Sequence, residues 1–302
     1  MFEIKEFLLK NLNDSIELKS NIVAYCPFCN HHKRKLSIDY ISGKYQCWVC
    51  HTKGRTLFSL FNRLKIDYSE IKDSLFKQKS LNYTEYTSEL NHVSLPSEYI
   101  RISFNDSITE KIVLNYLYSR HVTKEEILFN EIGYCLKGDY KGKIIIPSFD
   151  SKNRLNYFFA RDFIKKPGMN QLPDNINKDI IFFENHINYE LPVFLVEGGF
   201  DALSIKHNVI PLLGNTMNKY LLNQLIVNTP PKIYVILDKD AFDKSLKILK
   251  TLLNYCVDSE IYIVLLNEKD PSVLGYEKIW ELIKNNARVV DEYEIMKLKL
   301  RK

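Results

Sequence analysis

The C-terminal third of the chain has the most regular alternation of hydrophobic and polar positions. Short apolar runs, such as VFLV at 193–196 and IYVIL at 233–237, alternate with longer amphipathic segments, such as KSLKILKTLLNY at 244–255. Continuous apolar runs of strand length are typical of strands buried on both faces, and amphipathic segments between them are typical of covering helices. The pattern therefore predicts an α/β domain with a parallel sheet over residues 191–302.

The region before it, residues 98–190, has a mixed pattern. Residues from 108 predict two helices, and Thr123 precedes the second with Glu126 in capping-box spacing. Apolar residues on both sides of the turn at 150–153 predict two strands. These elements predict a mixed α/β segment ahead of the parallel sheet.

The N-terminal region is shorter and more polar. LSIDYI and KYQCWV, joined by Ser42 and Gly43, predict a β-hairpin. A helical pattern follows from Leu57 to Leu75, and residues 78–97 are rich in Ser, Thr and Asn without apolar period. We therefore predict a module over 1–64, then a helix and linker over 65–97.

Four of the six cysteines form two C-x-x-C pairs, with two residues inside each pair and seventeen between the pairs. A C-x-x-C turn holds two thiolates close enough to share one metal, and a hairpin can bring the second pair across to complete a tetrahedron. The spacing predicts a zinc ribbon with a structural Zn²⁺. The four ligands, which leave no open position for catalysis, are Cys26, Cys29, Cys47 and Cys50.

The same module carries positive charge and aromatic rings. Lys33, Arg34 and Lys35 offer cations for phosphates, and Tyr45 and Trp48 are expected to be exposed for stacking on unpaired bases. An equally open alternative is that Trp48 packs into the small ribbon core. The residues alone do not separate these two interpretations.

Carboxylates follow two of the predicted C-terminal strands. Glu197 and Asp201 lie in VEGGFDA after one strand, and Asp238 and Asp240 lie in LDKDA after another. If the two strands are neighbours, Glu197, Asp238 and Asp240 converge at one edge of the sheet, because parallel strands end there together. Carboxylate oxygens suit Mg²⁺ and metal-assisted phosphoryl or nucleotidyl transfer. Each motif alone is also common as a solvated strand end or helix cap.

A third acid, Asp270, follows the next strand and is preceded by Lys269. Taken alone, it is better interpreted as a turn and helix cap. Asp243, which follows the LDKDA motif, receives no role.

Composition sets wide limits. The chain has 302 residues, a formal net charge of +5 and 45% hydrophobic residues. This length allows two domains or one core with an added module, and the charge permits a polyanionic partner. No apolar run is long enough for a membrane span, and the charged N-terminus does not resemble a signal peptide. We expect a soluble, intracellular protein.

The ordered motifs resemble the DnaG-type DNA primases of bacteria and phages. The four-cysteine ribbon comes first, and E-G-x-F-D with D-x-D is similar to the TOPRIM signature of that family. NYLYSRHVTKEEILFNEIGYC, KIIIPSFDSKNRLNYFFARDF and EKDPSVLG resemble further family segments in the family's order. The resemblance covers nearly the whole chain. Within the family, the chain is most similar to the stand-alone primases of T-even-like phages.

This resemblance implies synthesis of short RNA primers from NTPs on a single-stranded DNA template. It implies a cytoplasmic protein, including that of a phage-infected bacterial cell, that works with a replicative helicase on a separate chain. Glu197, Asp238 and Asp240 would be catalytic. The residues implied around Mg²⁺ or Mn²⁺ are Glu197, Asp201, Asp238, Asp240 and Asp270. The residues implied to contact nucleotide or template are Lys143, Arg161, Lys166 and Lys269.

Two departures from the family pattern stand out. Ser272 occupies the position of a second acid, which predicts a weaker or absent cation site there, and Asp243 replaces a frequent glycine. Two other functions stay open: a TOPRIM nuclease or DNA-repair protein that acts on phosphodiesters, and a non-catalytic protein that binds single-stranded DNA or loads a helicase. The intact acids favour an enzyme over the last of these.

Overall fold

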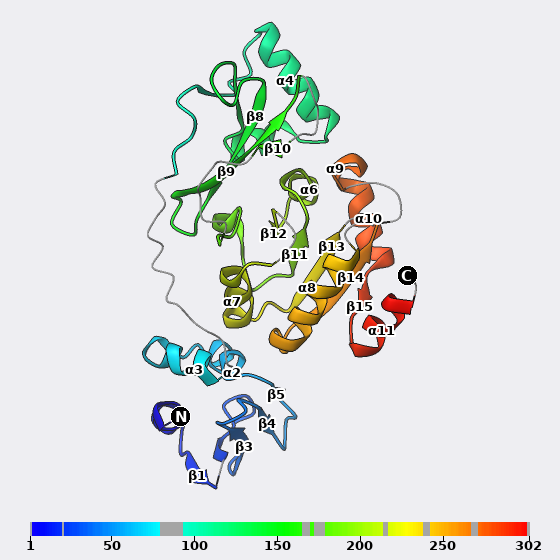
Figure 1. Cartoon of the computed structure of the whole chain (residues 1–302). Helices are drawn as coiled ribbons and strands as arrows, with labels where there is room; N and C mark the ends of the chain where they lie inside the picture. The colour runs from blue at the N-terminus through cyan, green and yellow to red at the C-terminus, as the bar shows by residue number, and fades with distance from the viewer. Residues whose placement is uncertain are drawn as a thin grey trace. The chain divides into compact units, whose positions relative to one another are not determined.

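The computed structural model describes residues 2–19, 21–78, 93–164, 170–171, 179–213, 217–237, 242–266 and 271–300. The chain divides into two compact units (Figure 1). Unit 1 contains residues 1–86 with the short segments 223–231 and 254–259, and unit 2 contains the remainder. Most of the linker predicted over 78–97 lies outside the described residues.

Unit 1 contains an antiparallel sheet whose five strands follow one another in chain order. In the turn between the third and fourth strands, Gly43 has a positive φ of 78°, and the Asp39 carboxylate accepts hydrogen bonds from the backbone N–H groups of Ile41 and Ser42. The hairpin predicted around Ser42 and Gly43 is confirmed. The strands are β1 (Ile16–Leu18), β2 (Asn21–Tyr25), β3 (Arg34–Asp39), β4 (Tyr45–Cys47) and β5 (Lys53–Gly54).

Helices form an aromatic core in unit 1. Thr56 caps α2 by accepting a hydrogen bond from Ser59 N, and the helix ends at Lys65 in a left-handed conformation. Phe61 of α2 packs edge-on against Phe7, with ring centroids 5.3 Å apart. The pattern from Leu57 to Leu75 predicted the second and third helices, whereas the first was not predicted. The helices are α1 (Phe2–Asn11), α2 (Leu57–Leu64), the 3₁₀ turn η1 (Ser69–Ile71) and α3 (Lys72–Gln78).

Unit 2 begins with a second antiparallel sheet, ordered β10-β9-β8-β7-β6. Its central hairpin has the turn predicted at 150–153, and the predicted capping box is present, because Thr123 N donates to Glu126 Oε2 at 2.7 Å and Glu126 N donates to Thr123 Oγ1. The helices are α4 (Ile108–Ser119) and α5 (Lys124–Phe129). The strands are β6 (Tyr99–Arg101), β7 (Gly133–Cys135), β8 (Lys143–Phe149), β9 (Leu155–Asp162) and β10 (Asn170–Gln171).

The third sheet has the order β12-β11-β13-β14-β15, and its first four strands run parallel. The last strand pairs antiparallel with β14, which extends the predicted parallel sheet into a mixed one. The strands are β11 (Val193–Val196), β12 (Val209–Pro211), β13 (Lys232–Leu237), β14 (Glu260–Leu265) and β15 (Arg288–Val289). The connecting elements are η2 (Glu184–His186), α6 (Gly199–Ile205), α7 (Lys219–Asn228), α8 (Phe242–Tyr255), α9 (Pro271–Leu274), α10 (Tyr276–Asn286) and α11 (Glu292–Leu300).

Both faces of this sheet are covered, as predicted. All four residues of β11 are buried. One face, which includes Phe194 and Val196, packs in a core with residues of α6 and α10, and Trp280 of α10 lies edge-on to Phe194 at 5.2 Å. Because side chains alternate along a strand, Val193 and Leu195 point to the opposite face. Figure 1 shows α8 lying along β13 and β14.

One hydrophobic core joins the two sheets of unit 2. Phe159 of β9 lies 5.9 Å from the ring of Phe200 in α6 and 5.6 Å from the ring of Phe182. Ile144 and Ile146 of β8 belong to the same buried cluster. The antiparallel hairpin is therefore held firmly against the start of α6, where the E-G-G-F-D residues lie.

Within the described part of the chain, every helix is too short or too polar to cross a membrane.

Candidate functional site

The four predicted zinc ligands come together at one point in unit 1. Their Sγ atoms all lie within 4.8 Å of one another. The Cys26–Cys50 pair is 3.7 Å apart and the Cys29–Cys47 pair is 3.9 Å apart. Four sulfurs at the usual Zn–S distance around a tetrahedral zinc are separated by about 3.8 Å. The cluster therefore fits a structural Zn²⁺, and the predicted ligand set is confirmed as a cluster.

Burial and local hydrogen bonds affect the four thiols unequally. Burial raises the pKa of Cys26 to about 12, whereas hydrogen bonding to Thr52 lowers the pKa of Cys50 to about 6. A buried thiol of this kind stays protonated at neutral pH without metal, and zinc must displace its proton on binding. Metal binding at this site is therefore coupled to proton release and to folding of the ribbon.

The ribbon surface partly matches the prediction. The Trp48 side chain is 64% exposed, so the alternative that it packs into the ribbon core is wrong. Its backbone N–H donates to Lys35 O at 3.0 Å, which places Trp48, the residue after β4, beside Lys35 of β3. The expectation that Tyr45 is exposed is also wrong, because Tyr45 is 3% exposed and its hydroxyl meets Ser59 Oγ at 3.0 Å.

Two of the three predicted basic residues of the ribbon differ in their surroundings. Lys33 is exposed. Arg34 forms an ion pair with Asp14 at 2.6 Å, and its Nε donates to Asp14 O at 2.7 Å. Its guanidinium also lies over the ring of Tyr25, 5.6 Å from the centroid. Arg34 therefore stabilises the fold locally, and contact with nucleic acid stays a prediction for all three basic residues.

The predicted acidic site required that the two strands preceding the acids be neighbours, and the strand order shows that they are. β11 and β13 are parallel neighbours, with Val196 paired to Ile236. Glu197 therefore follows its strand beside Leu237, the last described residue before the D-x-D motif. Asp238, Asp240 and Asp270 lie outside the described residues, as do Lys166 and Lys269. Their predicted roles stay predictions.

Glu197 is partly exposed at this edge of the sheet. Its carboxylate lies 3.9 Å from Lys244 Nζ of α8, and both side chains are about one-third exposed, at 36% and 37%. Lys244 was not predicted as a site residue. A cation beside this carboxylate offsets part of its charge and would have to be displaced, or shared, by a bound metal.

Two glycines let the chain turn closely after β11. A Cβ added to Gly199 would lie 2.1 Å from the ring of Phe159, so any side chain there would force the hairpin and α6 apart. Gly198 precedes it, and its N–H donates to Asp201 Oδ2 at 3.1 Å. The E-G-G-F-D sequence is therefore matched to close packing against β9.

Asp201, which the resemblance implies to lie around the metal, has backbone partners in the structure, and its role at the metal stays a prediction. Its side chain is 8% exposed, and its second oxygen, Oδ1, accepts a hydrogen bond from Ser272 N at 3.2 Å. Each oxygen thus has a backbone N–H partner, one in the loop after β11 and one in α9 after β14. This geometry makes Asp201 a bridge between two strand ends of the candidate site.

The bridge extends to an arginine that sequence analysis did not single out. Arg120 Nη1 donates to Ser272 Oγ at 3.3 Å, and Ser272 is 4% exposed. Arg120 lies in the quoted YLYSRH segment, but nothing in that segment marked it as a partner of Ser272. Ser272, at the position where the resemblance implies a second acid, therefore accepts a hydrogen bond from the cationic side chain of Arg120.

Arg161 lies close to the same loop. Its guanidinium carbon is 5.5 Å from the ring centroid of Phe200, which precedes Asp201, and its Nε donates to the Tyr116 hydroxyl at 3.3 Å. Lys143 is paired in register with Asp162 on the same hairpin, and Ile144 with Arg161. Since paired residues share a face, Lys143 and Arg161 lie on opposite faces of the sheet. The structure brings Arg161 to the candidate site and does not bring Lys143 beside it.

Asp243 is exposed in the first turn of α8. A carboxylate at the start of a helix interacts favourably with the helix dipole. This placement gives Asp243 an ordinary structural explanation, which sequence analysis did not find.

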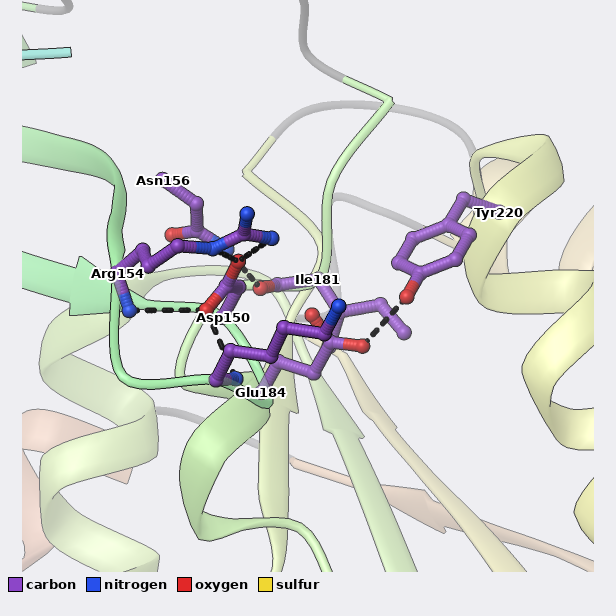
Figure 2. A network of polar contacts seen from close by, with 7 residues as sticks. Asp150, Arg154, Asn156, Ile181, Glu184 and Tyr220 are labelled. Carbon is purple, nitrogen blue, oxygen red and sulfur yellow. Dashed lines mark hydrogen bonds and ion pairs between the residues drawn. The ribbon is translucent and has the colours of Figure 1, made fainter. Parts of the chain in front are cut away.

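A polar network fixes the hairpin that carries Arg161 (Figure 2). The Asp150 carboxylate accepts from Arg154 N at 2.9 Å and Arg154 Nε at 2.8 Å. Burial opposes ionisation of Asp150, but the hydrogen bonds from Arg154 outweigh it and hold its pKa below the ordinary value. Asn156 Nδ2 donates to Ile181 O at 3.0 Å, so the start of β9 is joined to the segment before η2.

On the other side of the network, the Tyr220 hydroxyl donates to Glu184 Oε1 at 2.6 Å. Glu184 is 9% exposed, and burial raises its pKa although the bond from Tyr220 opposes this shift. The contact links η2 with the start of α7.

The known proteins that are similar to this chain are DNA primases. No family model matches the sequence. A DNA primase of Campylobacter jejuni is 24% identical over 287 residues, which covers 76% of this chain and 46% of that protein. The chain thus spans about half the length of this curated relative.

Solved structures agree in fold. The zinc-binding and RNA polymerase domains of the Aquifex aeolicus primase superpose with a TM-score of 0.52 at 19% identity, covering 99% of this chain and 88% of that one. The DnaG primase catalytic domain bound to single-stranded DNA gives a TM-score of 0.52 at 16% identity, covering 61% of this chain and 76% of that one. The chain therefore has the fold of a primase zinc-binding module followed by a primase RNA polymerase core.

Proposed function

We propose that this chain is a DNA primase that synthesises short RNA primers on single-stranded DNA by metal-dependent nucleotidyl transfer. The parallel pairing of β11 with β13 carries the proposal, because it sets Glu197 beside the strand end from which the D-x-D motif continues. The four-cysteine ribbon and the similarity to primases support the same function. A carboxylate-rich strand edge is the arrangement that holds Mg²⁺ or Mn²⁺ against nucleotide phosphates.

In this proposal, Glu197, Asp238 and Asp240 would hold the divalent cations, and Asp201 and Asp270 would lie around them. A divalent metal held by these residues would supply neutralisation of the nucleotide phosphate charge during attack by the primer 3′-hydroxyl. Arg161 supplies bidentate contact to a phosphate from its position beside Phe200. Lys166 and Lys269 add positive charge for nucleotide and template, and Lys143 does so from the other face of the hairpin.

The zinc ribbon contributes contact with the template. Exposed Trp48 offers a ring for base stacking, and Lys33 and Lys35 offer charge for the phosphates that flank the stacked base. These three residues form the stacking face of the ribbon. Arg34 supports this face through its ion pair with Asp14.

Three finer assignments rest on the sequence resemblance: the stand-alone phage type, a replicative helicase as a separate partner, and action inside a bacterial cell. The domain limits 1–64, 65–97, 98–190 and 191–302 rest on the hydrophobic pattern of the sequence.

The test combines the purified protein with single-stranded DNA of varied sequence, labelled NTPs, and Mg²⁺ or Mn²⁺. We expect short RNA products that disappear in Asp238→Ala and Asp240→Ala. Asp243→Ala is the matched control, because this acid lies nearby in sequence but is exposed at a helix start. It should retain synthesis.

Two outcomes would contradict the proposal. Cleavage of the DNA without RNA synthesis would indicate a nuclease that uses the same acids. Binding of single-stranded DNA without either reaction, under both metals, would indicate a non-catalytic binding protein.

A further inference from the structure

Helix α9 consists of only four residues, and it begins directly after Asp270 in the chain. A helix of this length is not stable by itself, because fixing the first turn costs more conformational freedom than its few hydrogen bonds return. Apolar burial secures only part of it, since the Val273 side chain is 42% exposed. The position of α9 therefore depends on the contacts that other elements of unit 2 make with it.

Two successive residues at the C-terminal end of α4 make such contacts. Arg120 Nη1 donates to Ser272 Oγ at 3.3 Å. His121 Nε2 lies 3.3 Å from Val273 O, and the histidine nitrogen is the donor, because a carbonyl oxygen only accepts. In α6, Asp201 Oδ1 accepts from Ser272 N. Helix α9 is thus bonded both to the end of α4 and to α6.

The backbone at His121 has a conformation that favours glycine. Its φ is positive, at 60°. His121 N donates to Tyr118 O at 2.9 Å, and Val122 N donates to Leu117 O at 3.1 Å. These two bonds form the Schellman motif that ends many helices, in which the residue at the position of His121 is left-handed and is usually glycine. The chain therefore keeps a side chain at a position where any side chain carries a steric cost.

A glycine after α9 leaves room for the imidazole ring. A Cβ added to Gly275 would lie 3.0 Å from His121 Cγ, and Gly275 itself has a positive φ of 80°. The ring therefore lies against the backbone that joins α9 to α10. A left-handed non-glycine residue is worth its steric cost where its side chain has a specific task, and the contact with α9 is the task that the structure offers.

We propose that Arg120 and His121 form a clasp that positions α9, and with it the preceding Asp270, for binding of the divalent metal. The inference rests on the proposed function, which assigns Asp201 and Asp270 to the surroundings of that metal. Arg120 and His121 are positioning residues, because they contact α9 and act on the metal through it.

The test measures Mn²⁺ affinity by electron paramagnetic resonance with the full-length zinc-loaded protein and no NTPs. His121→Gly removes an exposed side chain and supplies the residue that this backbone favours. Thermal unfolding without Mn²⁺ should therefore stay close to that of the wild type, since steric relief offsets the freedom that glycine adds to the unfolded chain. We expect the Kd for Mn²⁺ to rise roughly 2- to 10-fold, the factor that corresponds to one net hydrogen bond. His121→Gln, which keeps a side-chain N–H donor, should recover most of the affinity.

Ser272→Ala tests the other half of the clasp. It removes the oxygen that accepts from Arg120 and keeps the backbone N–H that donates to Asp201. We expect a rise in the Kd for Mn²⁺ of the same size, roughly 2- to 10-fold.

Each variant has a matched control. Lys65→Gly places glycine at another left-handed helix end, with a φ of 54°, in unit 1. Ser204→Ala removes a buried serine hydroxyl that bonds within its own helix, α6. Both controls should keep the Mn²⁺ affinity of the wild type. Wild-type affinity in both His121→Gly and Ser272→Ala would overturn the inference, and so would an equal loss of affinity in the controls.

Failure of this inference is distinguishable from failure of the proposed function. A wild-type protein that synthesises RNA, with clasp variants that bind Mn²⁺ normally, would remove the clasp and keep the primase. Weaker Mn²⁺ binding in the variants, with no RNA synthesis by the wild type, would keep the clasp and remove the primase. A wild-type protein that binds no Mn²⁺ would overturn both.

Discussion

Asp201 accepts a hydrogen bond from the backbone N–H of Ser272 at 3.2 Å, although the two residues are far apart in the chain. Its other oxygen accepts from Gly198 N at 3.1 Å. These bonds tie the loop after β11 to the helix that follows β14. Two of the three segments that carry the predicted acids are thus held together by one buried carboxylate, before any metal is considered.

We predict that Asp201→Asn destabilises the metal-free protein by about 1–3 kcal/mol, the cost of leaving a buried group without its partner. An amide presents an N–H₂ group to one of the two backbone N–H groups, so one bond must be lost. Thermal unfolding in the presence of a Mg²⁺ chelator that leaves zinc bound measures this. A residue that only bound metal would behave differently, because its neutralisation would relieve repulsion and leave the metal-free protein equally or more stable. Asp243→Asn, at an exposed position, is the control.

The ion pair between Lys244 and Glu197 leads to a prediction about metal affinity. Removing Lys244 removes a cation that competes for the Glu197 carboxylate. In Lys244→Gln, the Mg²⁺ concentration required for half-maximal thermal stabilisation should therefore fall. Both side chains are partly exposed, so the change should be no more than about fivefold. Lys247→Gln on the same helix is the matched control, and an increase in the required Mg²⁺ would show that Lys244 assists metal or phosphate binding instead.

The buried Glu184 should make stability depend on pH. Burial raises its pKa, so its contribution to the free energy of unfolding is fully present below the ordinary value of 4.5 and is lost as the pH rises through the higher folded value. Glu184→Gln keeps an acceptor for Tyr220 and removes the buried charge. We expect the variant to lose this dependence above pH 4.5 and to be as stable as the wild type, or more stable, at neutral pH.

Thermal unfolding across this pH range, with exposed Glu190→Gln as control, measures the effect. Asp150 and Arg154 face Glu184, but the lowered pKa of Asp150 places its own titration below the window. Parallel stability curves for Glu184→Gln and the wild type would contradict the assignment.

Sequence patterns predicted the longer elements because each carries enough residues for a period to be recognised. The βα alternation from 193 to 286 is confirmed for this reason. The capping box at Thr123 and the four-cysteine cluster are confirmed because specific residue types at fixed spacing mark them. Strands of two or three residues, such as β5 and β15, are too short to show a period and are held by their neighbours in the sheet.

Contacts between distant segments account for the remaining differences. The bridge from Asp201 to Ser272 depends on where α9 docks, which no local pattern reports. The resemblance implied that Lys143 and Arg161 both contact nucleotide or template, but the hairpin register puts them on opposite faces. The burial of Tyr45 could have been predicted, because it shares a face of β4 with the zinc ligand Cys47.

Arg161 supports a prediction on substrate use. Arg161→Lys keeps the charge and removes the planar fork and its position over Phe200. We expect kcat/KM for NTPs to fall roughly 10- to 100-fold, the range for loss of a charged hydrogen bond. Tyr116→Phe removes only the hydrogen bond to Nε and should have a smaller effect in the same direction. Arg101→Lys, on a different strand, is the control, and an equal loss there would show a general charge effect.

The zinc site yields a prediction that separates the two units. Cys47→Ser removes a buried ligand, and zinc binding contributes about 10–16 kcal/mol to the folding of small zinc modules. The ribbon should therefore unfold, while unit 2 keeps its own core and its strand-end acids. We expect loss of bound zinc and of initiation on bare template, with extension of a preformed RNA primer retained. Cys135→Ala, a buried cysteine of unit 2 outside the cluster, should keep its zinc and both reactions. Normal initiation by zinc-free Cys47→Ser would show that the ribbon has no part in template use.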